Sequence, residues 1–206
     1  MSQFFEIHPD NPQPRLINQA VAIVRQGGVL VYPTDSGYAI GCLVGDKGAM
    51  EQICRIRKIE KEHNFTLVCR DLSELSFYAR VENSVFRLMK NNTPGAYTFI
   101  LRATKEVPKR LQNPKRKTIG LRVPDHAISL ALLEALGEPL MSCSLILPGE
   151  EEAEYDPQLI RQRLEKQVNL IIDGGVLDPR PTTVIDLYDE TPIIVRQGAG
   201  DVRPFE

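Results

Sequence analysis

The chain has 206 residues, of which 42% are hydrophobic and 25% charged, and its net charge is -2. These values match an ordinary globular domain and exclude a protein that is basic overall, although a local basic patch remains compatible with them. The length suits one domain over residues 1–206. The longest apolar runs fall well short of the ~18 residues that indicate a membrane helix.

The cysteine and histidine pattern disfavours a metal site. The four cysteines and three histidines are scattered, and no two cysteines form a C-x-x-C pair. The N-terminal residues lack the basic and apolar regions of a signal peptide, and unpaired thiols suit a reducing compartment. We therefore expect a cytoplasmic protein without a bound metal.

The first half of the chain alternates predicted helices and strands. Ile17, Val21 and Val24 recur at helical spacing before Gly27, and an apolar run then predicts a buried strand from Val29 to Tyr32. Asp46 is expected to cap the next helix, and an apolar stripe follows between Val81 and Met89. Further strands are predicted over residues 65–69, 96–101 and 118–123.

The second half is richer in strands. Asp125 is expected to cap a helix that ends at Gly137, and Asp156-Pro157 is typical of a helix start. Several strands follow one another without an intervening helix. The sequence therefore predicts an α/β protein with a single mixed sheet, parallel and antiparallel, flanked by helices. These strands are predicted over residues 140–147, 169–172, 183–187 and 193–196.

Common nucleotide-binding loops are absent, since neither a G-x-x-x-x-G-K-[ST] nor a G-x-G-x-x-G pattern occurs. Five short elements at the ends of predicted strands are candidates instead. The first is Tyr-Pro-Thr-Asp-Ser-Gly over residues 32–37, where a strand runs into hydroxyl residues and glycine at the sheet edge. Sheets of this class bind ligands there, although an ordinary turn uses the same residue types.

The second and third elements each combine polar groups with an ordinary alternative. Arg55, Arg57, Lys58 and Lys61 end the second predicted helix, where they could clamp phosphate or only complement the helix dipole. Pro94-Gly95 precedes a strand on which Thr98 and Arg102 should share a face. That face suits a polar ligand or a half-exposed sheet.

The fourth and fifth elements add hydroxyls and a guanidinium. Ser142 and Ser144 should point the same way from an apolar strand, where buried hydroxyls need a ligand or neighbouring polar groups as partners. Thr182 and Thr183 open a later strand, and Arg196 closes the next one two residues before Gly198. An arginine beside main-chain N–H groups can bind phosphate.

The ordered set resembles the YrdC-like family of threonylcarbamoyl-AMP synthases. It comprises Tyr-Pro-Thr-Asp, a basic helix end, Pro-Gly-x-x-Thr, Arg122-x-Pro-Asp-His, Ser-x-Ser, Thr-Thr-Val-Ile-Asp and Arg-x-Gly. The resemblance runs from about residue 14 to residue 200. The segment His63-Asn64-Phe65 looks most like the YciO branch of the family.

The resemblance implies a YrdC-like fold, a twisted sheet around a large concave cleft, and an activity. Family members condense L-threonine, bicarbonate and ATP to threonylcarbamoyl-AMP and pyrophosphate, so ATP with Mg²⁺ would be a substrate, and we expect no tightly bound cofactor. The cleft would hold ATP or AMP. Carried over by motif, the substrate-binding residues would be Thr34, Arg102, Ser142 and Thr182, and the nucleotide-binding residues Arg57, Lys58, Thr98, Arg122, Ser144 and Arg196.

Two motifs depart from the family pattern. The synthases usually carry Lys-x-Arg at the basic helix end, where this chain has Arg57-Lys58-Ile59, and Ser-x-Asn where this chain has Ser144-Leu145-Ile146. Lost hydrogen bonds of these kinds cost about 1.5–3 kcal/mol for a charged group and 0.5–1.5 kcal/mol for a neutral one. The departures predict weak or altered synthase activity.

A second function class rests on the basic stretch between Pro108 and Lys117. Five cations fall within nine residues, and the helix-end cations could join them on one face that attracts a phosphate backbone. Few aromatics are near, so structured or double-stranded RNA is favoured over single strands. A solvated loop is the alternative to this RNA-binding site, and a non-catalytic double-stranded RNA-binding protein of tRNA or rRNA metabolism is the alternative to an enzyme. The five cations are Lys109, Arg110, Lys115, Arg116 and Lys117.

Overall fold

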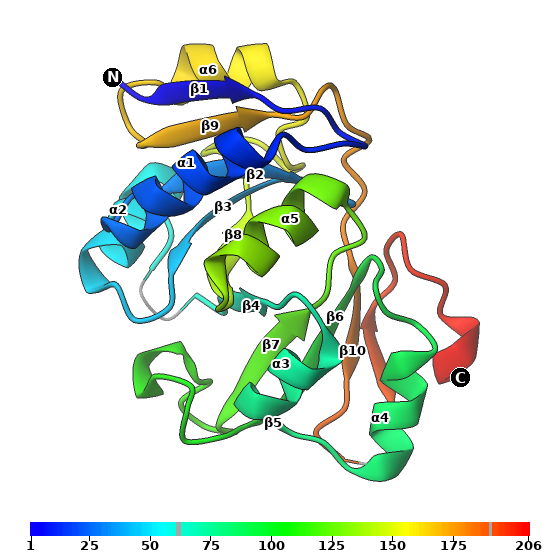
Figure 1. Ribbon diagram of the computed structural model, residues 1–206. Helices are drawn as coiled ribbons and strands as arrows, with labels where there is room; N and C mark the ends of the chain where they lie inside the picture. The colour runs from blue at the N-terminus through cyan, green and yellow to red at the C-terminus, as the bar shows by residue number, and fades with distance from the viewer. Residues whose placement is uncertain (61–62, 190) are drawn as a thin grey trace.

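The computed structural model describes residues 1–60, 63–189 and 191–206, and the strands in these ranges form one mixed sheet (Figure 1). The strand order is β1-β9-β2-β3-β8-β4-β7-β6-β10-β11, and β5 pairs with β6 at the side. The strands are β1 Gln3–Glu6, β2 Leu30–Thr34, β3 Gly37–Leu43, β4 Thr66–Val68, β5 Ala79–Arg80, β6 Tyr97–Ala103, β7 Thr118–Arg122, β8 Leu140–Ser144, β9 Leu170–Asp173, β10 Thr183–Asp186 and β11 Ile193–Arg196.

The three-residue strand β4 joins two halves of the sheet. It runs antiparallel to β8 and parallel to β7, so the sheet contains both kinds of pairing, as the sequence predicts. Figure 1 shows β1, β9, β2, β3 and β8 above it and β7, β6 and β10 below it. The helices are α1 Pro14–Arg25, α2 Lys47–Arg57, α3 Leu72–Tyr78, α4 Asn83–Lys90, α5 Ala127–Leu136 and α6 Pro157–Leu164.

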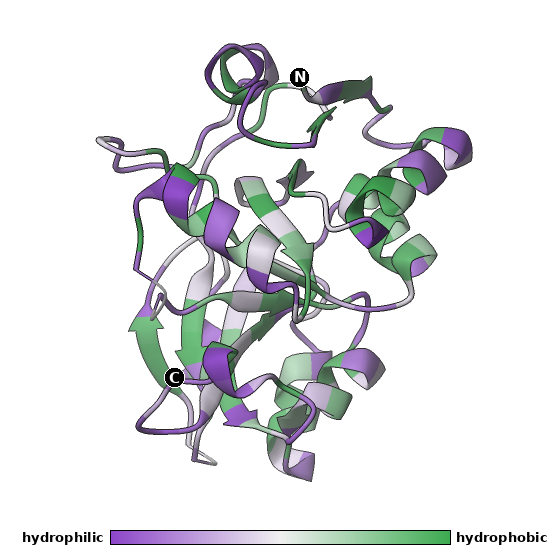
Figure 2. Ribbon diagram, turned by 90° about the vertical axis from the view of Figure 1, so that its left-hand side faces the viewer, coloured by the Kyte–Doolittle hydropathy of each residue, from purple (hydrophilic) through white to green (hydrophobic). Residues whose placement is uncertain are grey.

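The period-2 alternation of the strands separates two hydrophobic clusters. Leu30 and Tyr32 of β2 face the cluster that includes α1 and α5, whereas Val31 faces the larger cluster that includes α2. Hydrophobic colour accordingly concentrates on the strands in Figure 2, while the helices carry both colours. Both faces of the upper half are therefore covered, which explains the near-continuous apolar sequence of β2.

Two of the three predicted helix caps are confirmed. The Asp46 side chain accepts from Ala49 N at 2.9 Å, and Asp156 accepts from Gln158 N at 2.8 Å. The third prediction is wrong by one residue, since His126 Nδ1 accepts from Ile128 N at 3.3 Å and caps α5. Asp125 instead donates its main-chain N–H to Asp35, a contact with a distant turn that sequence alone does not indicate.

Several elements were not predicted. β3 follows directly on the Thr34–Gly37 turn and was not predicted as a strand, and α3 and the short β1 and β5 were also missed. The predicted strand over 140–147 stops at Ser144. Leu145 N still bonds to Tyr38 O at 2.9 Å, but Tyr38 N and Leu145 O bond to the main chain of Glu154 instead of to each other. Among the helices of the described ranges, none has the length and apolar character of a membrane span.

Candidate functional site

A cavity of about 440 Å³ opens between the two halves of the sheet. Strands β2, β3 and β8 supply its wall from one half, and β6, β7 and β10 from the other. Eight of the ten ligand residues predicted from sequence line it, although they come from seven places in the chain. These eight are Thr34, Arg57, Thr98, Arg122, Ser142, Ser144, Thr182 and Arg196.

The tight turn between β2 and β3 closes one end of the cavity. Thr34 Oγ1 donates to Gly37 O at 2.6 Å and accepts from Ser36 N at 3.1 Å, and Thr34 is only 2% exposed. Gly37 has a φ of +97°, a conformation that other residues rarely adopt. The Thr34 hydroxyl is thus held by the turn itself, and its orientation is fixed before any ligand arrives.

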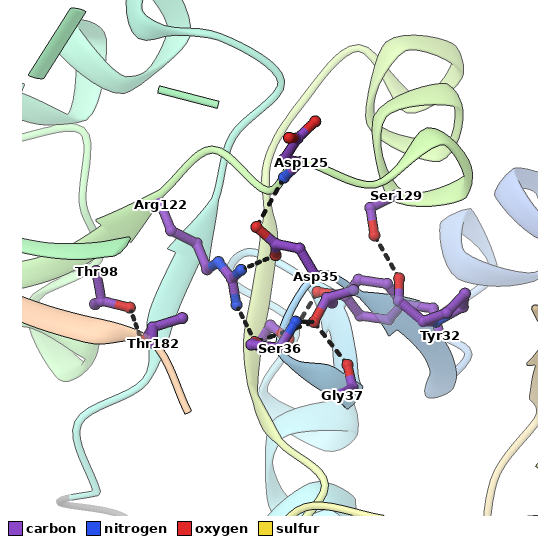
Figure 3. A network of polar contacts seen from close by, with 12 residues as sticks. Tyr32, Asp35, Ser36, Gly37, Thr98, Arg122, Asp125, Ser129 and Thr182 are labelled. Carbon is purple, nitrogen blue, oxygen red and sulfur yellow. Dashed lines mark hydrogen bonds and ion pairs between the residues drawn. The ribbon is translucent and has the colours of Figure 1, made fainter. Parts of the chain in front are cut away.

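Arg122 at the end of β7 reaches this turn from the other half of the sheet (Figure 3). Its Nη1 donates to Ser36 Oγ at 2.9 Å and its Nη2 donates to Asp35, whose second oxygen accepts from Asp125 N at 3.0 Å. The Arg122 and Asp35 side chains are 9% and 12% exposed. Among the described residues, Arg122 Nε is a buried polar atom without a hydrogen-bond partner. This end therefore holds a buried, mutually neutralising ion pair.

Ser142 finds its partners inside the protein. Tyr32 OH donates to Ser142 Oγ at 2.8 Å, and Ser142 Oγ donates to Ile40 O at 3.0 Å. Burial raises the pKa of Tyr32 to about 12, so its hydroxyl is a donor at neutral pH. Neighbouring groups thus satisfy Ser142, whereas Ser144, two residues on, is exposed at the cavity.

The opposite end is formed by Thr98, Thr182 and Arg196. The hydroxyls of Thr98 and Thr182 lie 2.9 Å apart, and Arg196 donates from Nε and Nη2 to Thr182 O at 3.1 and 2.9 Å. Arg196 is exposed, while Thr182 is 7% exposed. This guanidinium is anchored through a neutral carbonyl, so its charge is not neutralised by the contact.

The basic end of α2 contributes Arg57 but not its neighbours. Arg57 Nε donates to Ile146 O at 3.0 Å and brings the helix end to the cavity wall. Lys58 ends the helix in a left-handed conformation with φ 51°, is exposed, and lies outside the lining, as does Arg55. Lys61 lies outside the described residues.

Only one of the two motif departures stands in the cavity wall. Ile146 lines the cavity, whereas Ile59 packs, half-buried, against the main hydrophobic cluster. Ile59 N also donates to Cys54 O at 3.1 Å and closes the end of α2. The apolar residue at position 59 therefore serves the core, and an arginine there would lose that packing.

The predicted basic stretch divides between the cavity and the surface. Arg116 lines the cavity and pairs with Asp186, with Nη1–Oδ2 and Nη2–Oδ1 distances of 2.5 and 3.3 Å. Arg110 donates to Gly45 O, across the gap to the upper half. The exposed cations of the stretch outside the lining are Lys109, Arg110, Lys115 and Lys117.

Arg102 lies outside the cavity lining, although Thr98 and Ile100 of the same strand belong to it. Its guanidinium stands over the Tyr188 ring at 4.1 Å, and Arg116 lies 4.5 Å from the same ring. Arg102 also donates to Tyr188 O at 3.0 Å and pairs with Asp189 at 3.2 Å. Its observed contacts are thus those of a surface stack that fastens the end of β10.

The cavity lining carries positive charge. Four arginines line it, and no aspartate or glutamate is among the described lining residues. Asp35 and Asp186, just behind the wall, offset Arg122 and Arg116, while Arg57 and Arg196 contact main-chain carbonyls. Within the described ranges, no group of three or more potential metal ligands occurs. The arrangement suits an anionic ligand.

Residues 22–198 match the model of the Sua5, YciO and YrdC family, described as "Telomere recombination". The chain belongs to this family. It is 70% identical to the uncharacterized protein YciO of Escherichia coli K12 over 100% of both chains, and the crystal structure of E. coli YciO superposes with a TM-score of 0.95 at 70% identity over the full length of both. The resemblance and the fold class predicted from the sequence are thereby confirmed.

More distant relatives include named enzymes. The chain is 31% identical to a threonylcarbamoyl-AMP synthase of Stenotrophomonas maltophilia over 80% of this chain and 91% of that one. The crystal structure of P. abyssi Sua5 complexed with L-threonine matches with a TM-score of 0.87 at 23% identity, covering 96% of this chain and 58% of that one. At that identity the match shows a shared fold alone.

The sequence motifs did not identify part of the cavity wall. Tyr32, Tyr38 and His63 line it, and Asp35 and Ser36 anchor Arg122. The first candidate element, Tyr-Pro-Thr-Asp-Ser, contains three of these residues, Tyr32, Asp35 and Ser36. His63 belongs to the segment that resembles the YciO branch. The motif signal was therefore present, but the long-range pairing that gives each residue its role was not.

Proposed function

We propose that the cavity binds an adenine nucleotide, ATP or AMP, and supports a threonylcarbamoyl-AMP synthase-like reaction of weak or altered activity. The observation that carries the proposal is the lining, which combines four arginines with threonine and serine hydroxyls and, among its described residues, no carboxylate. Guanidinium groups and hydroxyls are the usual protein ligands of phosphate oxygens. A volume of about 440 Å³ also falls in the range of small-molecule sites.

The two ends of the cavity suggest how the substrates are arranged. Arg196 donates to the carbonyl of Thr182, so its charge stays uncompensated and suits the polyanionic phosphates of ATP, with the Thr98 and Thr182 hydroxyls beside it. The Arg122–Asp35 pair is neutral as a whole, so the end near Thr34 suits a zwitterion such as L-threonine together with bicarbonate. Binding of all three substrates side by side would supply the proximity on which this condensation depends.

The altered motifs support weak rather than optimised activity. Ile146 offers no hydrogen bond where the synthases usually have an amide, and Arg57 uses its Nε on the carbonyl of that same residue. Arginine also differs from the usual lysine in shape and hydration, so it cannot reproduce a point charge. We therefore expect turnover well below that of a synthase with both motifs.

The reaction is tested by ATP–pyrophosphate exchange. Labelled pyrophosphate should enter ATP only when L-threonine and bicarbonate are both present, because pyrophosphate leaves when the carbamate attacks the α-phosphate. Omission of either substrate is the internal control. Nucleotide binding without any exchange, at high enzyme concentration and with all substrates present, would reduce the protein to a nucleotide-binding member of the family.

Double-stranded or structured RNA is the second candidate ligand, and this candidate is supported by lysines that are exposed on the surface. Lys109, Lys115 and Lys117 are exposed on the segment between β6 and β7, outside the cavity lining. Two cations of the same loop have internal partners, since Arg116 pairs with Asp186 and Arg110 donates to Gly45 O. The electrostatic attraction for a phosphate backbone is therefore smaller than the five cations of the sequence suggest.

A further inference from the structure

The described wall of the cavity contains one side chain that can accept a proton at neutral pH. Among the described lining residues, eight have titratable side chains: Tyr32, Tyr38, Arg57, His63, Arg116, Arg122, Cys143 and Arg196. Arginine stays protonated throughout the physiological range and has no acceptor. The two tyrosines and the cysteine carry protons too, because burial raises the pKa of each. Only the imidazole of His63 remains.

The position of His63 follows from the segment that joins α2 to β4. Phe65 is buried in the main cluster, and the His63 ring stands edge-on to it, with ring centroids 5.3 Å apart. His63 O also accepts from Phe65 N at 3.0 Å, which tightens the segment just before β4. The imidazole is thus held at the cavity wall, on the side where Arg57 leaves α2.

The proposed reaction requires such a group. Threonine arrives as an ammonium ion, which has no lone pair, so one proton must leave before its nitrogen can form a bond to carbon. The free amine then attacks bicarbonate, the N–C bond forms, and water leaves with the carbamate as product. A carbamate oxygen next attacks the α-phosphorus of ATP, and pyrophosphate leaves with the electrons of the broken P–O bond. One proton per turnover therefore needs an acceptor in the cavity.

We propose that His63 is the proton acceptor for the ammonium group of the amino-acid substrate. The inference rests on the proposed function, because it assigns a role within that reaction. Burial, and secondarily the positive charge of Arg57, lower the pKa of His63 below its ordinary value, so the ring is neutral at pH 7. Of the other titratable lining groups, Arg57 is the one whose charge acts on the ring, and neither it nor Cys143 of β8 or Tyr38 of β3 competes for the proton.

A substitution of His63 by glutamine tests the assignment. Glutamine keeps a polar planar group but cannot take up a proton, so kcat should fall about 100-fold or more, as removal of a general base does. The KM for ATP should change less than ~3-fold, since the glutamine removes no phosphate contact. His8→Gln is the matched control, because His8 is exposed and remote from the lining, and its rate should match the parent's.

The pH profile separates a proton acceptor from a merely structural residue. In the parent, kcat/KM for threonine should fall with acid as His63 becomes protonated, with a midpoint below the ordinary histidine pKa of 6.5. His63→Gln should lose this acid limb, and imidazole added to His63→Ala should restore part of the rate. ATP binding by calorimetry checks that each variant is folded.

The outcomes separate the two proposals. Parent turnover with an unchanged rate and acid limb in His63→Gln would overturn the role of His63 and leave the synthase proposal standing. Absence of parent turnover at every pH, despite ATP binding, would overturn the synthase reaction and the role of His63 with it. A low rate in His63→Gln that keeps the parent's acid limb would mark His63 as structural and also overturn the role.

Discussion

Each end of the cavity contains an arginine, but the two arginines differ in burial and in hydrogen-bond partner. At the turn between β2 and β3, Arg122 is 9% exposed and pairs with Asp35 and Ser36. At the β10–β11 end, Arg196 is exposed and donates to the carbonyl of Thr182. A buried guanidinium requires a compensating carboxylate, whereas an exposed one does not, so only the second end keeps its net charge for a ligand.

The comparison extends to the loop between β6 and β7. Arg116 is 45% exposed yet also pairs with a carboxylate, because Asp186 behind the wall is only 9% exposed and needs a cation as partner. Lys115 and Lys117, its direct neighbours, are exposed and lie outside the lining. Cations adjacent in sequence therefore divide between structural support and surface charge, a division that a charge count cannot reveal.

The largest expected effect is on stability at the closed end. Arg122→Ala removes the cation that pairs with the buried Asp35 carboxylate. It should lower the free energy of unfolding by about 3–5 kcal/mol, the cost of breaking a buried ion pair. Arg196→Ala, the matched variant at the open end, should cost less than ~1 kcal/mol. Urea denaturation followed by circular dichroism measures both. Equal losses in the two variants would mean that the two ends do not differ as described.

A smaller effect is expected on RNA binding. Changing Lys109, Lys115 and Lys117 to alanine removes three exposed cations, so the slope of log affinity against log salt for duplex RNA should flatten by roughly 2–3, at ~0.9 per phosphate contact. Folding stability should hold, because exposed charges contribute little to it.

Arg116→Ala is the control for that experiment. This variant should lower the free energy of unfolding, because the buried Asp186 carboxylate loses its cation, and it should leave the slope of log affinity against log salt nearly unchanged. Filter binding at four or more salt concentrations provides the slopes. If the triple variant keeps the parent's affinity and slope, the loop is a solvated surface and the RNA candidate falls.

The sequence predicted the composition of the site better than its geometry. Eight of the ten predicted ligand residues line the cavity because short motifs at strand ends mark where a sheet presents its polar groups. Arg102 obeyed the same period-2 rule as Thr98 and Ile100, yet it lies beyond the cavity over Tyr188. The rule gives the face of a strand but not how far along it a cavity extends.

The remaining gaps concern pairing across the chain. The Arg122–Asp35 and Arg116–Asp186 contacts join residues 87 and 70 positions apart. Each depends on the strand order, which places β7 between β4 and β6 and brings β2 to the opposite wall. Hydrophobic periodicity specifies elements one at a time, so it carries no information on these partners.

The measurement that tests the account most directly compares ATP with AMP by calorimetry, in the parent and in Arg196→Ala. If the open end holds the phosphates, ATP should bind at least ~10-fold more tightly than AMP. Arg196→Ala should weaken ATP by roughly 10–100-fold, the value of one charged hydrogen-bonding group, and should weaken AMP much less. Arg203→Ala, an exposed arginine paired with Asp201 outside the lining, should bind both nucleotides as the parent does. Equal affinity of the parent for ATP and AMP, or no heat with either at millimolar concentration, would contradict the assignment of the phosphates to this end.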